Sequence, residues 1–555
     1  MENLKALPIG RDDFEKLIGN NCYYVDKTKL IKKLLETKSE VTLITRPRRF
    51  GKTLTMSMLQ NFFEYAGESS EDLFSGLEIE QERELCDTHK EQYPVISISL
   101  KSAKQGTYMN ALEMLKQTIS PEFKRHEKAV LAYNYEKDRI HRILNAEGGE
   151  SDYLSSLQFL SQILYDYYGK KVIVLIDEYD VPLENAYFQG FYDEMATFIR
   201  SLFESVLKSN PCLEFAVVTG CLRISKESIF TGLNNLHIIS ILNHGYAEYF
   251  GFTEEEVKHL LEYYDLSDRM PDMKRWYDGY RFGDVEIYNP WSVLSFISDL
   301  REKRTSSPKP YWSNTSSNSI IKSLIETADL KTKSQIEDLI DGGVIRSIIH
   351  EDVTYEDIYQ SKENLWNFLF FTGYLKKVSE TLIDGMVYID MKIPNKEVRE
   401  IYKTKITEWF QERIKKTDLS LLYQAMFACE TDKFQEQLEK QLHESISYYD
   451  GKEAFYHGFV LGLLSNMQDY LVESNREAGD GRPDILIKSY NVRKPAVILE
   501  LKHAKTFQEM QRMAERAVVQ IDKKHYAREL KRDGYENIVK YGISFYKKNC
   551  YIVNR

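Results

Sequence analysis

The sequence predicts an α/β protein with an N-terminal domain built on a parallel sheet, a largely helical middle part and a smaller α/β unit at the C-terminus. The first observation is an alternation of helical patterns with short, β-rich apolar runs, which lie at residues 41–45, 95–100, 172–176 and 215–219. Such alternation is typical of parallel strands connected by helices that cover both faces of the sheet. The second observation is that helical patterns dominate from about residue 246 to 375, before strand patterns return at 484–488, 496–502 and 541–546.

The length of the chain indicates several domains. It has 555 residues, and one domain takes about 100 to 200. We predict an α/β domain at residues 1–240, a helical lid with a winged-helix-like region at 241–410, and the second α/β unit at 411–555. In the middle part, a helical pattern at 365–371 precedes two strand patterns that flank Asp384-Gly385, a pair typical of a hairpin turn.

The composition is that of an ordinary folded protein, with 43% hydrophobic and 29% charged residues. The longest purely aliphatic run, Val172–Ile176, is far shorter than the roughly 18 residues of a membrane helix. We therefore expect a cytoplasmic protein with no membrane partner. Its six cysteines lack the spacing of a zinc site or a disulfide framework, so reduced thiols are expected.

The charge is unevenly distributed along the chain. The net charge of −11 argues against a uniformly basic nucleic-acid coat. Residues 485–555, however, hold 16 Lys and Arg against 7 Asp and Glu, so the C-terminal unit could contact phosphates. The alternative is that Lys523, Lys524, Lys531 and Arg532 only solvate helix faces.

Residues 46–53 have the character of a phosphate-binding loop. They follow the apolar run 41–44 and precede a helical pattern, which is the context such a loop requires. Gly51 permits close approach, Lys52 supplies a cation for the outer phosphates, and Thr53 supplies a hydroxyl for Mg²⁺. We expect ATP to contact a longer segment around them, namely Arg48, Arg49, Phe50, Gly51, Lys52, Thr53 and Leu54. The pattern GxxxxGK[ST] would place Gly at position 46, where this chain has Arg46.

A second strand pattern, residues 171–176, ends in Asp177 and Glu178. In nucleotide hydrolysis, a carboxylate in the first position orders the magnesium shell and one in the second polarises the attacking water. The alternative is a buried strand that simply meets solvent at acidic residues. Together with the loop, in the expected order, the pair predicts a site for ATP and Mg²⁺.

A third strand pattern, residues 215–219, ends in Thr219, whose hydroxyl could sense the terminal phosphate. Arg223 follows within one turn. It could stabilise developing charge in its own subunit or in a neighbouring subunit of a homo-oligomer. The alternative is a simple ion pair with Asp177, Asp180 or Glu227.

The C-terminal unit carries a second group of charged residues. Residues two apart on a strand point to the same face, so Glu500 and Lys502 are expected to project together. With Asp484 opening the preceding strand, two carboxylates could bind Mg²⁺, and Lys502 could orient or deprotonate the attacking water. An isolated ExK triplet often occurs by chance. The added Asp484 and the strand context favour a phosphodiester-cleaving site.

Several segments together resemble the AAA-ATPase-like family of bacterial and archaeal proteins. The segments are Pro8–Gly10, Tyr24–Thr28, the loop at 46–53, Asp177–Asp180, Arg223–Phe230, Trp276–Tyr280, Tyr288–Ser292, Phe371–Leu375 and Asn475–Glu477. The Arg in place of the first loop glycine, at position 46, also resembles the family pattern. The resemblance implies a P-loop NTPase domain joined to a restriction-endonuclease-like domain of the PD-(D/E)XK superfamily.

The resemblance also implies roles for further C-terminal residues. Pro483-Asp484 and Glu500-Leu501-Lys502 match the superfamily pattern, which makes Asp484, Glu500 and Lys502 the catalytic candidates. Glu477 resembles an acidic residue that some members add to the metal site from an upstream helix. Gln520 and Tyr526 resemble a polar pair on the helix after the core strands.

The aromatic residues of the middle part permit two interpretations. Seven of them lie between positions 276 and 312: Trp276, Tyr277, Tyr280, Tyr288, Trp291, Tyr311 and Trp312. Exposed, they could stack on unpaired bases. We favour the alternative that they form the core of the helical lid.

These observations predict an ATP-binding protein and ATPase coupled to a metal-dependent nuclease-like domain that acts on DNA or RNA. One alternative is an ATP-driven regulatory switch whose nuclease-like domain is inactive and binds nucleic acid or protein. A second alternative is a scaffold in which both sites are vestigial.

Overall fold

The computed structural model describes residues 4–65, 72–222, 229–230, 233–314, 321–322, 325–326, 328–350, 361–445, 452–465, 467, 470–474 and 481–555. The chain forms two compact units. Unit 1 comprises Met1–Ser316 and Arg346–Val398, and unit 2 comprises Ser317–Ile345 and Arg399–Arg555. The three-part division at residues 240 and 410 stays a prediction. No helix in the described part of the chain is both long and apolar enough to cross a membrane.

A five-stranded parallel sheet forms the centre of unit 1, as predicted. Its strands are β1 (Val41–Thr45), β2 (Val95–Ser99), β3 (Val172–Asp177), β4 (Leu213–Gly220) and β5 (Leu236–Ile239), in the order β2-β3-β4-β1-β5. Every residue of β1 and β3 is buried, which explains why their sequences are mostly apolar and show no strict alternation with polar residues. Because β4 lies between β1 and β3, the residues at the carboxyl ends of these three strands meet at one edge of the sheet.

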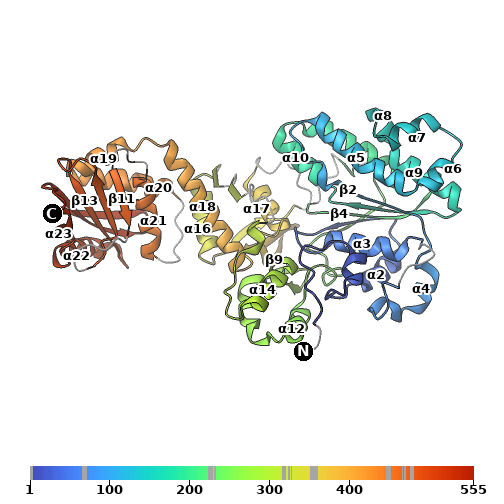
Figure 1. The fold of residues 1–555 in the computed structure, drawn as a ribbon, viewed down its shortest axis with the longest axis horizontal. Helices are drawn as coiled ribbons and strands as arrows, with labels where there is room; N and C mark the ends of the chain where they lie inside the picture. The colour runs from blue at the N-terminus through green and yellow to red at the C-terminus, as the bar shows by residue number, and fades with distance from the viewer. Residues whose placement is uncertain are drawn as a thin grey trace. The chain divides into compact units, whose positions relative to one another are not determined.

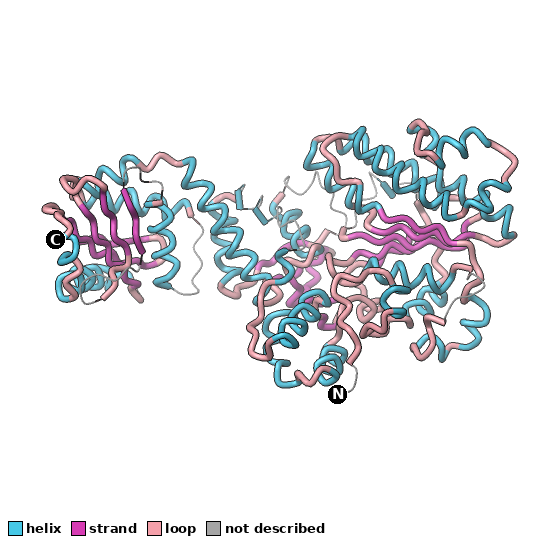
Figure 2. The backbone as a smooth tube through the Cα atoms, in the orientation of Figure 1, coloured by secondary structure: helices cyan, strands magenta, loops and turns pink. Residues whose placement is uncertain are grey.

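Helices cover both faces of this sheet (Figures 1 and 2). One layer contains α5 (Tyr108–Arg125), α6 (Glu127–Ala132), α7 (Lys137–Leu144), α8 (Glu150–Tyr153), α9 (Ser156–Tyr168) and α10 (Val181–Gln189). The opposite layer contains α2 (Lys29–Thr37), α3 (Lys52–Phe63) and α4 (Arg83–His89). Further helices of the domain are α1 (Phe14–Gly19), which packs on α3, and α11 (Tyr192–Leu207), which packs on β4.

The remainder of unit 1 begins with a capped helix, as the sequence indicates. Thr253 accepts a hydrogen bond from the backbone N–H of Glu256, whose side chain accepts one from the N–H of Thr253, and α12 (Glu254–Tyr263) follows. The other elements are α13 (Met270–Tyr277), β6 (Tyr280–Phe282), β7 (Val285–Ile287), α14 (Pro290–Glu302), β8 (Ile345–Ile348), α17 (Lys362–Phe371), β9 (Lys376–Ile383) and β10 (Met386–Lys392). The predicted hairpin turn at Asp384-Gly385 connects β9 and β10, and both residues have positive φ.

The aromatic residues between 276 and 312 form a core, as favoured. Tyr277, Tyr280, Tyr288 and Trp312 are fully buried. Tyr277 and Tyr288 belong to a cluster with Val293 and Phe296 of α14. Trp276 and Tyr311 are partly buried and pack against this cluster. Trp291, also partly buried, instead faces a cavity described below.

Unit 2 contains a mixed five-stranded sheet. Its strands are β11 (Tyr470–Ser474), β12 (Ile485–Ser489), β13 (Ala496–His503), β14 (Ile538–Tyr546) and β15 (Asn549–Asn554), in chain order across the sheet. Only β13 and β14 are parallel. The helices are α16 (Leu330–Ile340), α18 (Lys396–Lys416), α19 (Ser420–Phe427), α20 (Thr431–Glu444), α21 (Lys452–Leu464), α22 (Met510–Lys523) and α23 (Ala527–Arg532).

The two faces of this sheet pack on different helices. Alternate residues such as Leu499 and Leu501 join a core with α19, α20 and α21, whereas Ile498 joins a core with α22 and α23. Helix α22 approaches β14 closely at Gly542, where a Cβ atom would lie 2.1 Å from the carbonyl oxygen of Ala514. Glycine at this position therefore allows the helix to lie directly over β13 and β14.

A buried carboxyl group anchors the start of α18 in unit 1. Glu397 is fully buried, and Ser292 Oγ lies 2.9 and 2.8 Å from its two carboxylate oxygens. The backbone N–H of Trp312 donates to Glu397 Oε1 at 2.9 Å. Burial raises the pKa of Glu397 to about 8. The group is therefore largely protonated in the folded protein at neutral pH.

Replacing Glu397 with Gln is expected to flatten the dependence of stability on pH. The pKa of a glutamate is ordinarily 4.5, so the folded wild-type protein binds a proton that the unfolded chain releases. Its free energy of unfolding should fall between pH 4.5 and 8, by an amount on the order of several kcal/mol. The amide of the variant has no proton to lose in this range. Urea unfolding at about pH 5, 7 and 9 should show the variant gaining stability relative to wild type as pH rises. Parallel pH profiles would refute this, and Glu400→Gln on the partly exposed side of α18 is the control.

Candidate functional sites

The loop between β1 and α3 has the backbone of an anion-binding turn. Arg49 and Gly51 have φ values of 71° and 89°, and α3 begins immediately afterwards at Lys52. Positive φ values in a turn before a helix direct successive N–H groups toward one point, beside the positive end of the helix dipole. Gly51 has open space on the side where a Cβ would lie. The loop therefore has room for phosphates without a glycine at its first position.

Arg46 anchors the loop at that first position. Its side chain is fully buried and donates to the carbonyl oxygens of Thr45, Ile239 and Tyr246 at 2.8, 3.3 and 3.2 Å. The guanidinium also lies 5.2 and 5.0 Å from the ring centroids of Phe250 and Phe282. The side chain therefore packs behind the loop and leaves the phosphate side open.

Three predicted residues meet at this edge of the sheet: Thr53 at the start of α3, Asp177 at the end of β3 and Thr219 near the end of β4. Thr53 Oγ1 donates to Asp177 Oδ2 at 2.7 Å, and Thr219 Oγ1 donates to Asp177 Oδ1. Lys52 Nζ donates to the carbonyl oxygens of Arg46 and Pro47 at 2.9 and 3.0 Å, and is only 5% exposed as a residue. The side chain of Lys52 is thus held over its own loop, where phosphate oxygens could replace the two carbonyls.

The residues after Asp177 have different surroundings. Glu178 has φ 52° and lines the cavity next to the loop. Asp180 is buried, and its Oδ2 accepts the backbone N–H groups of Cys221 and Leu222 at 2.7 and 3.1 Å. Burial raises the pKa of Asp180 to about 6. Asp180 therefore supports the turn after β4, while Arg223 lies outside the described residues.

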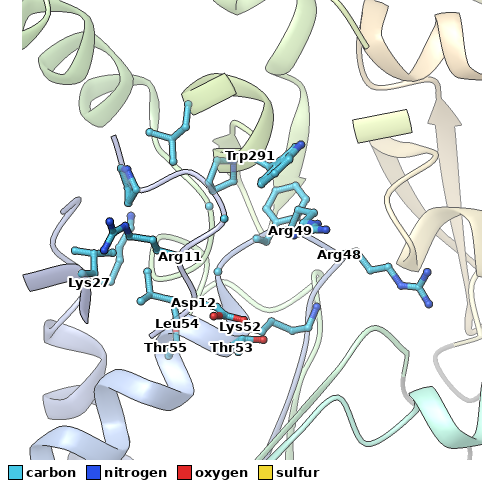
Figure 3. A pocket seen from close by; sticks show the side chains of 18 of the residues that line it. Arg11, Asp12, Lys27, Arg48, Arg49, Lys52, Thr53, Leu54, Thr55 and Trp291 are labelled. Atoms are coloured by element: carbon cyan, nitrogen blue, oxygen red, sulfur yellow. The ribbon is translucent and has the colours of Figure 1, made fainter. Parts of the chain in front are cut away.

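A cavity of about 460 Å³ extends from the loop toward the N-terminal segment and α14 (Figure 3). Cationic side chains in its lining are Arg11, Lys27, Arg48, Arg49, Lys52, Lys101 and Lys104. Apolar side chains in its lining are Ile9, Leu17, Val25, Leu54, Phe252, Trp291 and Leu294. The guanidinium of Arg49 lies 4.7 Å from the ring centroid of Trp291. Arg48 extends away from Lys52 and forms an ion pair with Glu184 of α10.

A second site lies in unit 2, where Asp484 and Glu500 come together. Asp484 precedes β12, and its Oδ2 accepts the backbone N–H of Leu501 at 2.7 Å. Glu500 is 2% exposed, and its Oε1 accepts hydrogen bonds from Lys502 Nζ at 2.9 Å and from Gln520 Nε2. Burial, and then the charge of Asp484, raise the pKa of Glu500 to about 7.

His457 of α21 also contacts this site. Its Nε2 lies 2.9 Å from the carbonyl oxygen of Asp484 and 3.0 Å from Ser474 Oγ. It thereby fixes the backbone at Asp484, where the chain enters β12. Glu477 lies outside the described residues. Tyr526 is buried beside Gly481, upstream of Asp484.

Comparison with known proteins finds two family models that match this chain. Residues 8–230 match the family model "Predicted AAA-ATPase", and residues 451–555 match the model "PD-(D/E)XK nuclease superfamily". The chain joins an AAA-ATPase-like domain to a PD-(D/E)XK nuclease-superfamily domain. It is also similar to the "Uncharacterized protein in vnfD 5'region" of Azotobacter chroococcum mcd 1, with 28% identity over 408 residues, which cover 71% of this chain and 68% of the relative.

The donor set of the PD-(D/E)XK domain fits a divalent cation. Glu500 Oε2 is buried and has no hydrogen-bond partner among the described residues, although it lies beside a second carboxylate. An oxygen-binding cation would satisfy it and relieve the repulsion between the two groups. Across the described residues, no three His, Cys, Asp or Glu side chains gather into a metal site. Asp484 and Glu500 therefore account for two ligand side chains.

Individual motifs do not predict the cavity-lining residues of the AAA-ATPase-like domain that are distant in sequence from the phosphate loop. Pro8–Asp12 and Trp291 line the cavity, although the sequence motifs place neither of them at a nucleotide. The available signal was their presence among the segments that carry the family resemblance. The contact of His457 with the backbone of Asp484 joins a helix to a distant strand end.

Proposed function

We propose that the AAA-ATPase-like domain binds and hydrolyses ATP with Mg²⁺, and that the PD-(D/E)XK domain is a metal-dependent nuclease whose access to DNA or RNA depends on the bound nucleotide. The first half rests on one observation. Thr53 and Thr219 both donate to Asp177, beside the loop over which Lys52 is held. The paired carboxylates Asp484 and Glu500 beside Lys502 carry the second half.

In the AAA-ATPase-like domain, the N–H groups of Arg48, Arg49, Phe50, Gly51 and Lys52 bind the phosphates. Lys52 Nζ leaves its two carbonyls for the outer phosphates, and Thr53 and Asp177 hold Mg²⁺, which neutralises phosphate charge. Glu178 orients the attacking water, and Thr219 responds to the terminal phosphate. Arg223 supplies a positive charge, in its own subunit or in a partner within a homo-oligomer. The base lies in the cavity, in contact with Leu54 and Trp291.

In the PD-(D/E)XK domain, Asp484 and Glu500 hold the divalent cation, with Glu477 as the third acidic ligand. A cation bound there would supply the charge that lowers the pKa of water and stabilises the scissile phosphate. Lys502 orients or deprotonates this water. Gln520 is a positioning residue, because it fixes Glu500 Oε1 and leaves Oε2 for the metal.

An assay of the full chain tests both halves. ATP hydrolysis and cleavage of single-stranded and double-stranded nucleic acid are measured with Mg²⁺ or Mn²⁺, with and without ATP. Asp484→Ala and Lys502→Ala should abolish cleavage and leave ATP hydrolysis at the wild-type rate. If no nucleotide state gives cleavage but nucleic acid still binds, the domain is an inactive binding module in an ATP-driven switch. A titration in which ATP causes no thermal shift would favour a scaffold in which both sites are vestigial.

A further inference from the structure

The two flanks of α22 differ in charge. Arg516, Lys523 and Lys524, which we call the basic flank, are the i−4, i+3 and i+4 neighbours of Gln520. On a helix, residues at these spacings lie side by side. Gln520 itself donates to Glu500. The basic flank therefore borders the Asp484–Glu500–Lys502 site and is exposed to solvent.

The acidic residues of α22 lie on the other side of the helix. Glu515 and Asp522 are five and two residues from Gln520, which at about 100° per residue places them roughly 140–160° around the helix from it. Asp522 also accepts hydrogen bonds from Lys540 and Arg555 at 2.6 and 3.2 Å. The negative charges of this helix are thus remote from the site, and the charge of Asp522 is compensated.

Two of the positive charges on the site's side lack an ion-pair partner among the described residues. Arg516 and Lys523 have no carboxylate within 4.0 Å among the residues that the structure describes, whereas Arg512 on the same helix pairs with Glu509 at 3.2 Å. The exposed cations continue beyond α22 into α23, with Arg528, Lys531 and Arg532. Exposed cations of this kind can neutralise the phosphates of a polyanion, which releases the salt ions condensed on it.

We infer that the basic flank and α23 form a track for the phosphodiester backbone of a nucleic acid whose scissile phosphate reaches Asp484, Glu500 and Lys502. The choice of a nucleic acid as the partner rests on the proposed nuclease function. A row of cations that ends at the Asp484–Glu500–Lys502 site suits a chain of phosphates. It adds a binding surface outside the catalytic residues. The track contacts backbone and carries no base recognition.

Binding without cleavage tests the track. The full chain, freed of divalent metal with EDTA, is titrated with fluorescent duplex and single-stranded DNA and RNA of about 30 nucleotides in about 50 to 300 mM KCl. The test variant is Arg516→Gln/Lys523→Gln/Lys524→Gln. The matched control, Lys433→Gln/Arg512→Gln/Lys540→Gln, removes the same charge from residues that pair with Glu430, Glu509 and Asp522.

The expected result is a loss of about 10- to 100-fold in affinity at low salt for the test variant, with less than threefold for the control. The slope of log K against log[salt] should become shallower by about 2 to 3 for the duplex, because each phosphate contact contributes about 0.9, or about 0.7 for a single strand. An unchanged melting temperature shows that the variant folds. Equal losses in both variants, an unchanged slope, or equally strong competition by polyglutamate would overturn the track. Since no cleavage is measured, an inactive nuclease leaves this result intact.

Discussion

Replacing Lys52 with Ala is expected to abolish ATP binding and hydrolysis while the AAA-ATPase-like domain stays folded. Lys52 Nζ bonds to two carbonyl oxygens of its own loop and pairs with no carboxylate in the described part of the chain. Its removal should cost the fold only about 1–2 kcal/mol. The loss for the nucleotide is larger, because a buried cation aimed at the phosphates is removed, and we expect kcat/KM for ATP to fall by at least roughly 10²-fold.

The measurement is the shift in melting temperature caused by ATP with Mg²⁺, together with the rate of phosphate release. Lys32→Ala is the matched control, because Lys32 is a lysine of the same domain that pairs with Glu82 outside the cavity. Wild-type nucleotide shifts in Lys52→Ala would show that the phosphates bind elsewhere. A collapse of the melting temperature without nucleotide would show that the carbonyl contacts hold the fold.

Replacing Glu500 with Gln is expected to change stability and metal response in opposite directions. Burial and Asp484 raise the pKa of Glu500 to about 7 from 4.5. Its folded-state contribution is therefore complete below pH 4.5 and disappears as pH rises through 7. Gln has no such loss, so well above pH 7 the metal-free variant should be more stable than wild type by about 3 kcal/mol. The variant also loses a charged metal ligand, so cleavage and Mg²⁺-dependent stabilisation should disappear.

Melting temperatures at about pH 6 and pH 8, with and without excess Mg²⁺, check this prediction. Glu515→Gln on the far flank of α22 removes the same charge. This control should neither raise the stability of the metal-free protein nor remove its stabilisation by Mg²⁺. If Glu500→Gln lowers stability at about pH 8, the carboxylate is held by favourable contacts that the structure does not contain. If Mg²⁺ stabilises the variant as much as wild type, the cation binds at another site.

The sequence indicates those parts of each candidate site that lie within one continuous segment. The loop at 46–53 and the strand that ends in Asp177 are local patterns, so their chemistry follows from residue order. The order of strands across the sheet is not local. That β4 lies between β1 and β3, which brings Thr219 onto Asp177, follows only from the packing of the whole sheet. Trp291 reaches the cavity through similarly distant contacts.

Some positions could be predicted by type but not by role. Arg46 replaces the first glycine of the usual pattern, and the sequence assigns its side chain no role. Its buried contacts with carbonyls and aromatic rings are structural. For Asp180, its position just past the carboxylate pair favours support of the turn over the metal, and the side chain accepts two backbone N–H groups. For Arg46 the deciding information is which surface of the fold the side chain enters.

The anchoring of Arg46 has a consequence for how the protein responds to acid. A guanidinium tied to a carboxylate is released when that carboxylate takes up a proton. The described contacts of Arg46 are with carbonyl oxygens and aromatic faces, none of which titrates. Acidification should therefore protonate the carboxylates of the proposed nucleotide site at a higher pH than the one that loosens the loop at 46–53. ATPase activity lost at low pH should then return on neutralisation without refolding.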